Sequence, residues 1–345
     1  MNPTMYMIII SSLTMGTIIT MTSHHWLLAW MGLEINTLAI IPIMSMQHHP
    51  RSTEAATKYF LTQAAASAMI LFSSTTNAWY TSTWDITQMT TPHSNILLTL
   101  ALSMKLGLVP LHFWLPEVLQ GSTMTTALII TTWQKLAPMS LIYMSMNNLY
   151  PTVLLTTGLL SSIVGGWGGL NQTQTRKIMA YSSIAHLGWM ATVSSIMTNI
   201  LVLNLLIYLT MTTTMFYSLM LLKSKTIQDT TTSWTTSPML TIIMMLTLLS
   251  LGGLPPLTGF MPKWLVLEAL TTQSLNPMAL IMAMASLLSL FFYLRLTYTT
   301  TLTLSPNSTQ TKYKWRFKPN MIHTPLTTTM PTTLLLLPLT PLLIY

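Results

Sequence analysis

Long apolar segments alternate with short polar connections along the whole chain. A helix needs about 20 mostly apolar residues to cross the hydrocarbon core of a bilayer. Eleven segments meet this requirement and predict helices over residues 3–22, 26–46, 55–77, 95–117, 123–146, 151–170, 175–196, 200–222, 238–270, 277–300 and 325–344. No connection is long enough to fold as a soluble domain. Because lipid offers the backbone no hydrogen-bond partners, we predict an all-α polytopic membrane protein with a single membrane domain over residues 1–345.

The composition supports this class and excludes several others. Hydrophobic residues make up 51% of the 345 residues and charged residues only 6%, against about 25% charged residues in a soluble domain. A soluble enzyme and a disordered chain are therefore excluded. The net charge of +8 rests on 14 Lys and Arg, too few for a phosphate-binding surface, so no nucleic-acid partner is expected. Because Cys is absent, thiol catalysis and a thiolate metal site are excluded. Adjacent residues of a helix face different directions, so the pairs His24-His25 and His48-His49 are weak ligand sets, and no metal site is predicted.

The Lys and Arg residues divide the predicted connections into two classes. The connections can be assigned alternately to the two sides of a membrane. One side then receives no Lys or Arg, and the other receives Arg51, Arg176, Lys177, Lys223, Lys225, Lys312, Lys314, Arg316 and Lys318. This asymmetry follows the positive-inside rule and supports the number of spans. It predicts that the N-terminus lies on the positive side and the C-terminus on the opposite side.

Four charged residues lie in the interior of predicted spans, away from the span ends, where a charge costs at least about 2.5–3.5 kcal/mol. They are Glu34, Lys105, Lys135 and Lys263, each on a different helix. One interpretation is a static ion-pair network, although one Glu cannot neutralise three Lys. The other is a proton pathway, since burial disfavours the charged form of a lysine and so allows it to release a proton. We favour the pathway. Lys58 and Arg295, near span ends, are interpreted as interfacial anchors.

Two histidines within predicted spans are candidate relay groups. His186 is one helical turn from Ser182 and Ser183, so the three share a face. His112 follows a proline in the span 95–117. A hydrogen-bonded interior histidine and a proton relay explain either position equally well.

Two segments share a sequence pattern. Residues 107–117 read GLVPLHFWLPE, and residues 253–263 read GLPPLTGFMPK. The span 238–270 would be about 50 Å long as a straight helix, whereas the hydrocarbon core is about 30 Å thick. We therefore predict broken helices at both segments. The copies lie five spans apart, in opposite orientations, which predicts inverted five-helix repeats over 26–170 and 175–300, followed by a C-terminal helix over 325–344.

These motifs resemble a known family. Residues 50–60, PRSTEAATKYF, and residues 176–188, RKIMAYSSIAHLG, are similar to signatures of the antiporter-like subunits of respiratory complex I. The two Gly-Leu-x-Pro-Leu segments belong to the same pattern. The resemblance covers essentially the whole chain. The opening Met-Asn-Pro and the segment Gly-Gly-Trp-Gly-Gly-Leu-Asn-Gln narrow the resemblance to the vertebrate members of this family and, among these, to the mammalian ones. The Met-rich, Cys-free composition fits a mitochondrially encoded protein.

The resemblance implies a proton-translocating subunit in the membrane arm, driven by electron transfer from NADH to ubiquinone. The family's buried Glu and three Lys correspond to Glu34, Lys105, Lys135 and Lys263. The implied location is the mitochondrial inner membrane, with the N-terminus in the matrix and the C-terminus in the intermembrane space. The implied partners are other membrane-arm subunits, including the antiporter-like chain 4 and chain 4L, accessory subunits, and lipids such as cardiolipin. No cofactor is expected on this chain; NADH, flavin, iron–sulfur clusters and ubiquinone are expected on other subunits.

In the mechanism that we expect, Glu34 and Lys105 form an ion pair in one state. At about 5 Å and an effective dielectric constant of about 20, such a pair is worth about 3 kcal/mol. Separating the pair sends the Lys105 proton to Lys135 and then, through water and His186, to Lys263. Two other functions use the same residues: a free-standing cation/proton antiporter, and a structural subunit with a vestigial channel.

Overall fold

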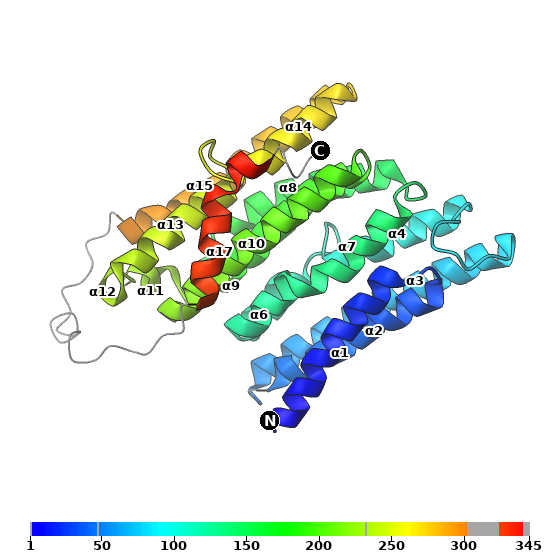
Figure 1. Cartoon of the computed structure of the whole chain (residues 1–345), viewed down its shortest axis with the longest axis horizontal. Helices are drawn as coiled ribbons and strands as arrows, with labels where there is room; N and C mark the ends of the chain where they lie inside the picture. The colour runs from blue at the N-terminus through cyan, green and yellow to red at the C-terminus, as the bar shows by residue number, and fades with distance from the viewer. Residues whose placement is uncertain (1, 47, 232, 302–323, 341–345) are drawn as a thin grey trace. The chain divides into compact units, whose positions relative to one another are not determined.

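The computed structural model describes residues 2–46, 48–231, 233–301 and 324–340 (Figure 1). Over these residues it is helical, with no strand beyond two isolated bridges, His25 to Asp85 and Gln174 to Thr226. The predicted all-α class is confirmed. Judged by length and hydropathy, the described helices that are able to cross a membrane are α1 (Pro3–Thr22), α2 (Trp26–Ser45), α10 (Thr198–Leu222) and α15 (Asn276–Thr301).

The chain divides into two compact units. Unit 1 comprises residues 1–161 and 194–196, and unit 2 the remainder. Besides α1 and α2, unit 1 contains α3 (Pro50–Thr81), α4 (Pro92–Leu106), α5 (Trp114–Gly121), α6 (Met124–Thr131), α7 (Trp133–Ser145) and the start of α8 (Pro151–Gly169). Besides α10 and α15, unit 2 contains α9 (Thr175–Ser194), α11 (Ile227–Thr231), α12 (Ser233–Thr236), α13 (Pro238–Gly252), α14 (Phe260–Thr272), α17 (Thr324–Leu335) and the 3₁₀ helix η1 (Leu337–Leu339). The predicted span 325–344 extends beyond residue 340, and Lys312, Lys314, Arg316 and Lys318 also lie outside the described residues.

Many Ser and Thr side chains of these helices bond to carbonyls of their own helix. In α1, for example, Thr17 donates to the carbonyl of Thr14 at 2.8 Å, and Thr20 donates to the carbonyl of Thr17 at 2.8 Å. In such a bond, the hydroxyl group donates to a carbonyl about one turn earlier in the same helix. A chain rich in hydroxyl groups can therefore pack in a nonpolar environment without leaving these donors unpaired.

In unit 1, the helix α1 packs along α2, α2 packs on α3, and α3 packs on both α4 and α5 (Figure 1). The first of these crossings depends on two glycines. A Cβ atom on Gly16 would lie 2.3 Å from Oδ1 of Asn36 and 2.9 Å from the carbonyl oxygen of Gly32. A Cβ atom on Gly32 would lie 2.8 Å from the carbonyl oxygen of Gly16. The two backbones can approach this closely only because neither residue has a side chain.

In unit 2, α13 packs against α10 and α15, and α17 packs on α10 and α13 (Figure 1). Side chains reinforce the unit by bonding to backbone carbonyls of other segments. Thr258 Oγ1 bonds to the carbonyl of Thr333, and Arg295 Nη1 donates to the carbonyl of Leu170 at 2.8 Å. Arg295, which the sequence indicated as an interfacial anchor, thus contacts the chain just past the end of α8, where carbonyls lack helical partners.

Two apolar helices break at glycines with a left-handed backbone. Gly107, with φ +77°, caps the C-terminus of α4, and Gly253, with φ +79°, caps that of α13. Helix resumes at Trp114 as α5 and at Phe260 as α14. These are the two segments where the sequence predicted a break. A further interruption, at Thr132 between α6 and α7, was not predicted, because the sequence around it contains neither Gly nor an immediately adjacent Pro.

We predict that Gly16→Ala weakens the packing of α1 on α2. The new methyl group would overlap Asn36 and the Gly32 backbone, and overpacking of this kind typically costs about 1–3 kcal/mol. Ser11→Ala is the control, since Ser11 is exposed on the same helix and its hydroxyl bonds only within that helix. Thermal unfolding in detergent, followed by tryptophan fluorescence, measures the difference. Equal transition temperatures for the two variants would contradict the proposed crossing.

Candidate functional site

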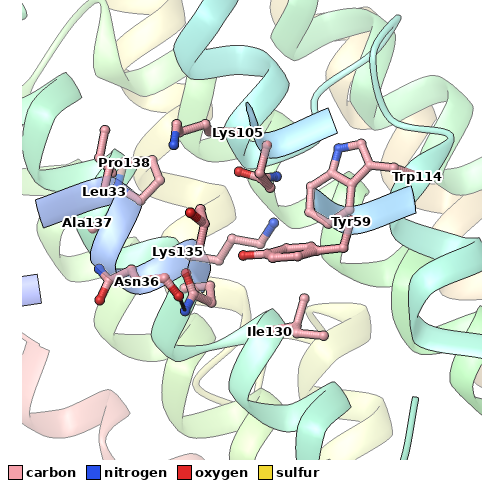
Figure 2. A pocket seen from close by; sticks show the side chains of 12 residues that line it. Leu33, Asn36, Tyr59, Lys105, Trp114, Ile130, Lys135, Ala137 and Pro138 are labelled. Carbon is pink, nitrogen blue, oxygen red and sulfur yellow. Dashed lines mark hydrogen bonds between the residues drawn. The ribbon is translucent and has the colours of Figure 1, made fainter. Parts of the chain in front are cut away.

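A small cavity in unit 1 contains two of the predicted lysines. It is lined by Leu33, Asn36, Thr37, Tyr59, Gln63, Lys105, Trp114, Ile130, Gln134, Lys135, Ala137 and Pro138. Figure 2 shows Lys105, Lys135, Tyr59 and Trp114 converging on it from separate parts of the fold. Its free space suffices for about one water molecule. Side chains from α2, α3, α4, α5, α6 and α7 therefore meet around one polar site.

Lys135 is held by the broken end of α4. Its side chain is 2% exposed, and Nζ donates to the carbonyl of Leu106 at 2.6 Å. Leu106 is the last residue of α4, so its carbonyl lacks a helical partner and lies at the negative end of the helix dipole. The ammonium also lies 5.3 Å from the ring centroid of Trp114, a distance suited to a cation–π interaction.

Lys105 lines the same cavity but, unlike Lys135, has no hydrogen-bond partner for its ammonium group within the part of the chain that the structure describes. It is 4% exposed, and its Nζ makes no hydrogen bond in the structure. The Nδ2 and Oδ1 atoms of Asn36 and the Nε2 atom of Gln63, from two more lining residues, are likewise buried without a hydrogen bond. Buried polar atoms of native proteins nearly always have a partner in the protein or in ordered water. Lys105 Nζ and Gln63 Nε2 therefore mark a place where water fits the site.

Glu34 lies beside the cavity and is not one of its lining residues. It is half-buried on α2, and its Oε2 atom accepts a hydrogen bond of 3.2 Å from Thr37 Oγ1. Glu34 interacts electrostatically with Lys105 and Tyr59. Among the described residues, however, no ion pair joins Glu34 to a lysine. The structure thus has Glu34 and Lys105 near each other but not in the paired state that the sequence-based mechanism begins with.

His112 lies in the break between α4 and α5. It is buried, with Nδ1 3.3 Å from the carbonyl oxygen of Pro110 and its ring 4.3 Å from that of Phe113. It does not line the cavity that contains Lys105 and Lys135. His112 is thus a buried polar residue of the broken segment, and these contacts include no bond to a lysine.

Lys263, in unit 2, also bonds to the end of a broken helix. It comes from α14, and its Nζ donates to the carbonyl of Gly252, the last residue of α13, at 2.7 Å. A Cβ atom on the next residue, Gly253, would lie 2.9 Å from this Nζ. Close approach of the ammonium therefore requires glycine at this position. In both units, then, a lysine ammonium bonds to the last carbonyl before the break.

His186, from α9, contacts two buried tyrosines of unit 2. Its Nε2 is 3.5 Å from the hydroxyl of Tyr293, and its ring centroid is 5.7 Å from that of Tyr208. Lys263 interacts with it electrostatically. Sequence reasoning missed both tyrosines. Their polar hydroxyls within apolar spans were the signal, the same one that identified the buried charges.

Lys58 has two acidic partners on the exposed surface of unit 1. Its Nζ lies 2.5 Å from Glu54 and 2.6 Å from Glu117. The Glu54 contact follows from the spacing of four residues along a helix, whereas the Glu117 contact joins α3 to α5 and was not predicted. Lys58 is 41% exposed in its side chain and does not belong to the buried site. Within the described residues, no three His, Cys, Asp or Glu side chains form a group suited to a metal ion.

The chain matches known proteins over its whole length. A family model described as NADH:quinone oxidoreductase/Mrp antiporter, TM, matches residues 23–289, and one described as NADH dehydrogenase subunit 2 C-terminus matches residues 290–344. NADH-ubiquinone oxidoreductase chain 2 of Varanus timorensis is 56% identical over 344 residues, covering 100% of both chains. The chain belongs to the NADH-ubiquinone oxidoreductase chain 2 family.

The same-named protein of Oncorhynchus mykiss is 57% identical over 341 residues, covering 99% of this chain and 98% of the relative. These matches confirm the family resemblance drawn from the motifs, and its vertebrate range. The narrower mammalian source stays a prediction. The signatures at residues 50–60 and 176–188, together with the motifs that narrow the resemblance, therefore predicted the family correctly.

Two solved structures share the fold. A chain of respiratory complex I from Thermus thermophilus aligns with a TM-score of 0.85 at 25% identity, covering 97% of this chain and 78% of that chain. A chain of the Mrp complex from Dietzia sp. DQ12-45-1b aligns with a TM-score of 0.85 at 17% identity, covering 97% of this chain and 75% of that chain. The second likeness shows the fold alone.

We predict that Gly253→Ala disrupts the Lys263 site. A residue with a side chain is strained at φ +79° by about 1–2 kcal/mol, and its Cβ would overlap the Lys263 side chain. The neighbouring Gly252→Ala is the control, because its Cβ would meet only ordinary contacts, the nearest at 3.6 Å from Leu290. Thermal inactivation of the assembled complex compares the two variants. If Gly253→Ala is as stable as Gly252→Ala, the assigned backbone conformation is wrong.

Proposed function

We propose that this chain is a membrane-arm subunit of respiratory complex I that translocates protons. Electron transfer from NADH to ubiquinone, on other subunits, drives the translocation. The observation that carries the proposal is the cavity of unit 1, where Lys105 and Lys135 are both buried and neither forms an ion pair among the described residues. A buried charge without a counterion is costly, and such a site suits a group that gives up and regains its proton.

In unit 1, the proton-carrying groups are Glu34, Lys105 and Lys135, with His112 as a further candidate. A proton leaves Lys105 most easily when Glu34 no longer stabilises the ammonium. Lys135 offers the next amine in the same cavity. The carbonyl of Leu106 and the face of Trp114 hold its ammonium, so Lys135 retains a proton without needing an acidic partner.

In unit 2, the proposed groups are His186 and Lys263. The carbonyl of Gly252 holds the Lys263 ammonium as that of Leu106 holds Lys135. His186 can accept a hydrogen bond from Tyr293 or donate one to it, depending on its tautomer. The contact with Tyr293 fits a hydrogen-bonded interior histidine as well as a relay, and we propose the relay because Lys263 also interacts with His186 electrostatically.

We further propose eleven membrane spans in one membrane domain, with inverted repeats over residues 26–170 and 175–300 and a last helix over 325–344. Support comes from the matching breaks of α4 and α13 at Gly107 and Gly253. The proposed location is the mitochondrial inner membrane, with the N-terminus in the matrix and the C-terminus in the intermembrane space. The Lys and Arg asymmetry supports this orientation.

The proposed partners are the other membrane-arm subunits, in particular chain 4 and chain 4L, together with accessory subunits and lipids such as cardiolipin. No cofactor is proposed on this chain, because it has no Cys to bind a cluster. NADH, flavin, iron–sulfur clusters and ubiquinone are assigned to other subunits. The energy for pumping then reaches this chain through contacts with its partners.

A second candidate function is a free-standing cation/proton antiporter. The observation that favours it is the family model over residues 23–289, whose description names the Mrp antiporter beside NADH:quinone oxidoreductase. The two functions differ in one respect that is simple to measure, namely whether transport by the chain depends on NADH oxidation. A structural subunit with a vestigial channel is distinguished by mutation, because replacing its buried lysines would leave pumping unchanged in complexes that assemble.

We predict that Lys135→Met lowers NADH-driven proton pumping at least about tenfold in assembled complex I, because the proton has no amine to occupy between Lys105 and the next group. Lys225→Met is the control, since Lys225 is an exposed loop lysine. Native gels measure assembly, and a pH-sensitive dye in reconstituted vesicles measures pumping per NADH oxidised. If Lys135→Met does not assemble, Lys105→Arg is used instead to test whether a buried lysine carries the proton, because arginine keeps the positive charge. Normal pumping per electron in either assembled variant would falsify the lysine pathway.

A further inference from the structure

Glu34 and the lysine cavity are connected in the structure by a hydroxyl group rather than by an ion pair. Thr37 Oγ1 donates to Glu34 Oε2 at 3.2 Å. Thr37 also lines the cavity that contains Lys105 and Lys135, whereas Glu34 does not. Thr37 is therefore the lining residue that forms a hydrogen bond with the Glu34 carboxylate among the described contacts.

Helix geometry explains this placement. Leu33, Asn36 and Thr37 are spaced three and four residues apart on α2, so they share the face that borders the cavity. Glu34 is rotated away from that face, but it lies one turn before Thr37 and within reach of its hydroxyl. The hydroxyl has one proton and two nearby acceptors, Glu34 Oε2 at 3.2 Å and the Glu34 carbonyl at 2.9 Å. Rotation about one bond thus changes which acceptor it serves.

The cavity has the features of a site for a single water molecule. It offers about the space of one water, and two of its lining side chains have a buried polar atom without a hydrogen bond, Lys105 Nζ and Gln63 Nε2. These two groups are donors and the Thr37 hydroxyl oxygen is an acceptor, and a buried water typically needs two to four such partners. A water molecule at this position would bridge the Thr37 hydroxyl group and the Lys105 ammonium group.

We propose that Thr37 is a proton-relay residue that links Glu34 to Lys105 through one water molecule in this cavity. The inference rests on the proposed function and adds a residue to its pathway. For transfer towards Glu34, Lys105 Nζ gives a proton to the water, and the water gives another of its protons to Thr37 Oγ1. Thr37 then gives its original hydroxyl proton to Glu34 Oε2. Lys105 and Glu34 end neutral, the water and Thr37 are regenerated, and the reverse transfer uses the same bonds.

A structural role for Thr37 makes a different prediction. Many Thr residues of this chain bond to carbonyls of their own helix, and loss of such a bond affects stability alone. Thr99 is such a residue, buried on α4, with its hydroxyl 2.8 Å from the carbonyl of Ile96, and it does not line the cavity. Thr99→Val therefore removes the same kind of helical hydrogen bond without touching the relay.

The test compares Thr37→Val, Thr37→Ser and Thr99→Val in assembled complex I. Valine matches threonine in shape and lacks the hydroxyl, so Thr37→Val is expected to lower the NADH-driven pumping rate about tenfold or more. Thr37→Ser keeps the hydroxyl and Thr99→Val lies elsewhere, so both are expected to stay within about twofold of the unmodified complex. Infrared difference spectra provide a second readout, in which the Glu34→Gln variant identifies the band of protonated Glu34. This band should shift in Thr37→Val, because the Glu34 carboxyl group loses its hydrogen-bond partner, and should stay unchanged in Thr37→Ser.

Two outcomes overturn the proposal. One is pumping at the unmodified rate by assembled Thr37→Val, or by Thr37→Ala if the valine variant does not assemble. The other is an equal loss of pumping in Thr37→Val and Thr99→Val, which assigns both hydroxyls a structural role. The Lys135→Met experiment separates this inference from the proposed function. If Lys135→Met abolishes pumping while Thr37→Val does not affect it, the lysine pathway stands and Glu34 communicates with Lys105 by another route.

Discussion

The hydrogen bond between a buried ammonium and the last carbonyl of a broken helix determines much of this structure. Gly107 and Gly253 turn the backbone out of the helix with positive φ, which leaves the carbonyls of Leu106 and Gly252 without helical partners. Each carbonyl accepts a bond from a lysine, Lys135 or Lys263. A carbonyl at a helix C-terminus carries part of the negative end of the helix dipole, so it stabilises the ammonium without an ionised acid. The break in the helix and the buried charge therefore depend on each other.

The apolar pattern of the sequence predicted the helices well, because segments long enough to cross a bilayer must be helical once backbone hydrogen bonds are satisfied internally. The breaks at Gly107 and Gly253 followed from Gly and Pro within segments too long for one span. The interruption at Thr132 did not, since no residue type there marks it.

The site was predicted less completely than the fold. The buried charges Lys105, Lys135 and Lys263 stood out because charge is rare in apolar spans. The contacts of these charges depend on which helix faces are brought together, and that information is not local. The sequence therefore suggested an ion pair between Glu34 and Lys105, whereas in the structure the Glu34 carboxylate accepts a hydrogen bond from the Thr37 hydroxyl group. It likewise missed Tyr208 and Tyr293 beside His186, as well as Glu117 on Lys58.

The two lysine–carbonyl bonds differ in what they connect. Lys135 bonds across 29 residues from α7 to the end of α4, whereas Lys263 bonds across 11 residues within the broken helix formed by α13 and α14. A sliding movement of α7 along α4 would lengthen the first bond and leave the second unchanged. A change in the bend between α13 and α14 would do the reverse. The two ammonium groups thus respond to different mechanical inputs, one to the relative position of neighbouring helices and the other to the shape of a single helix.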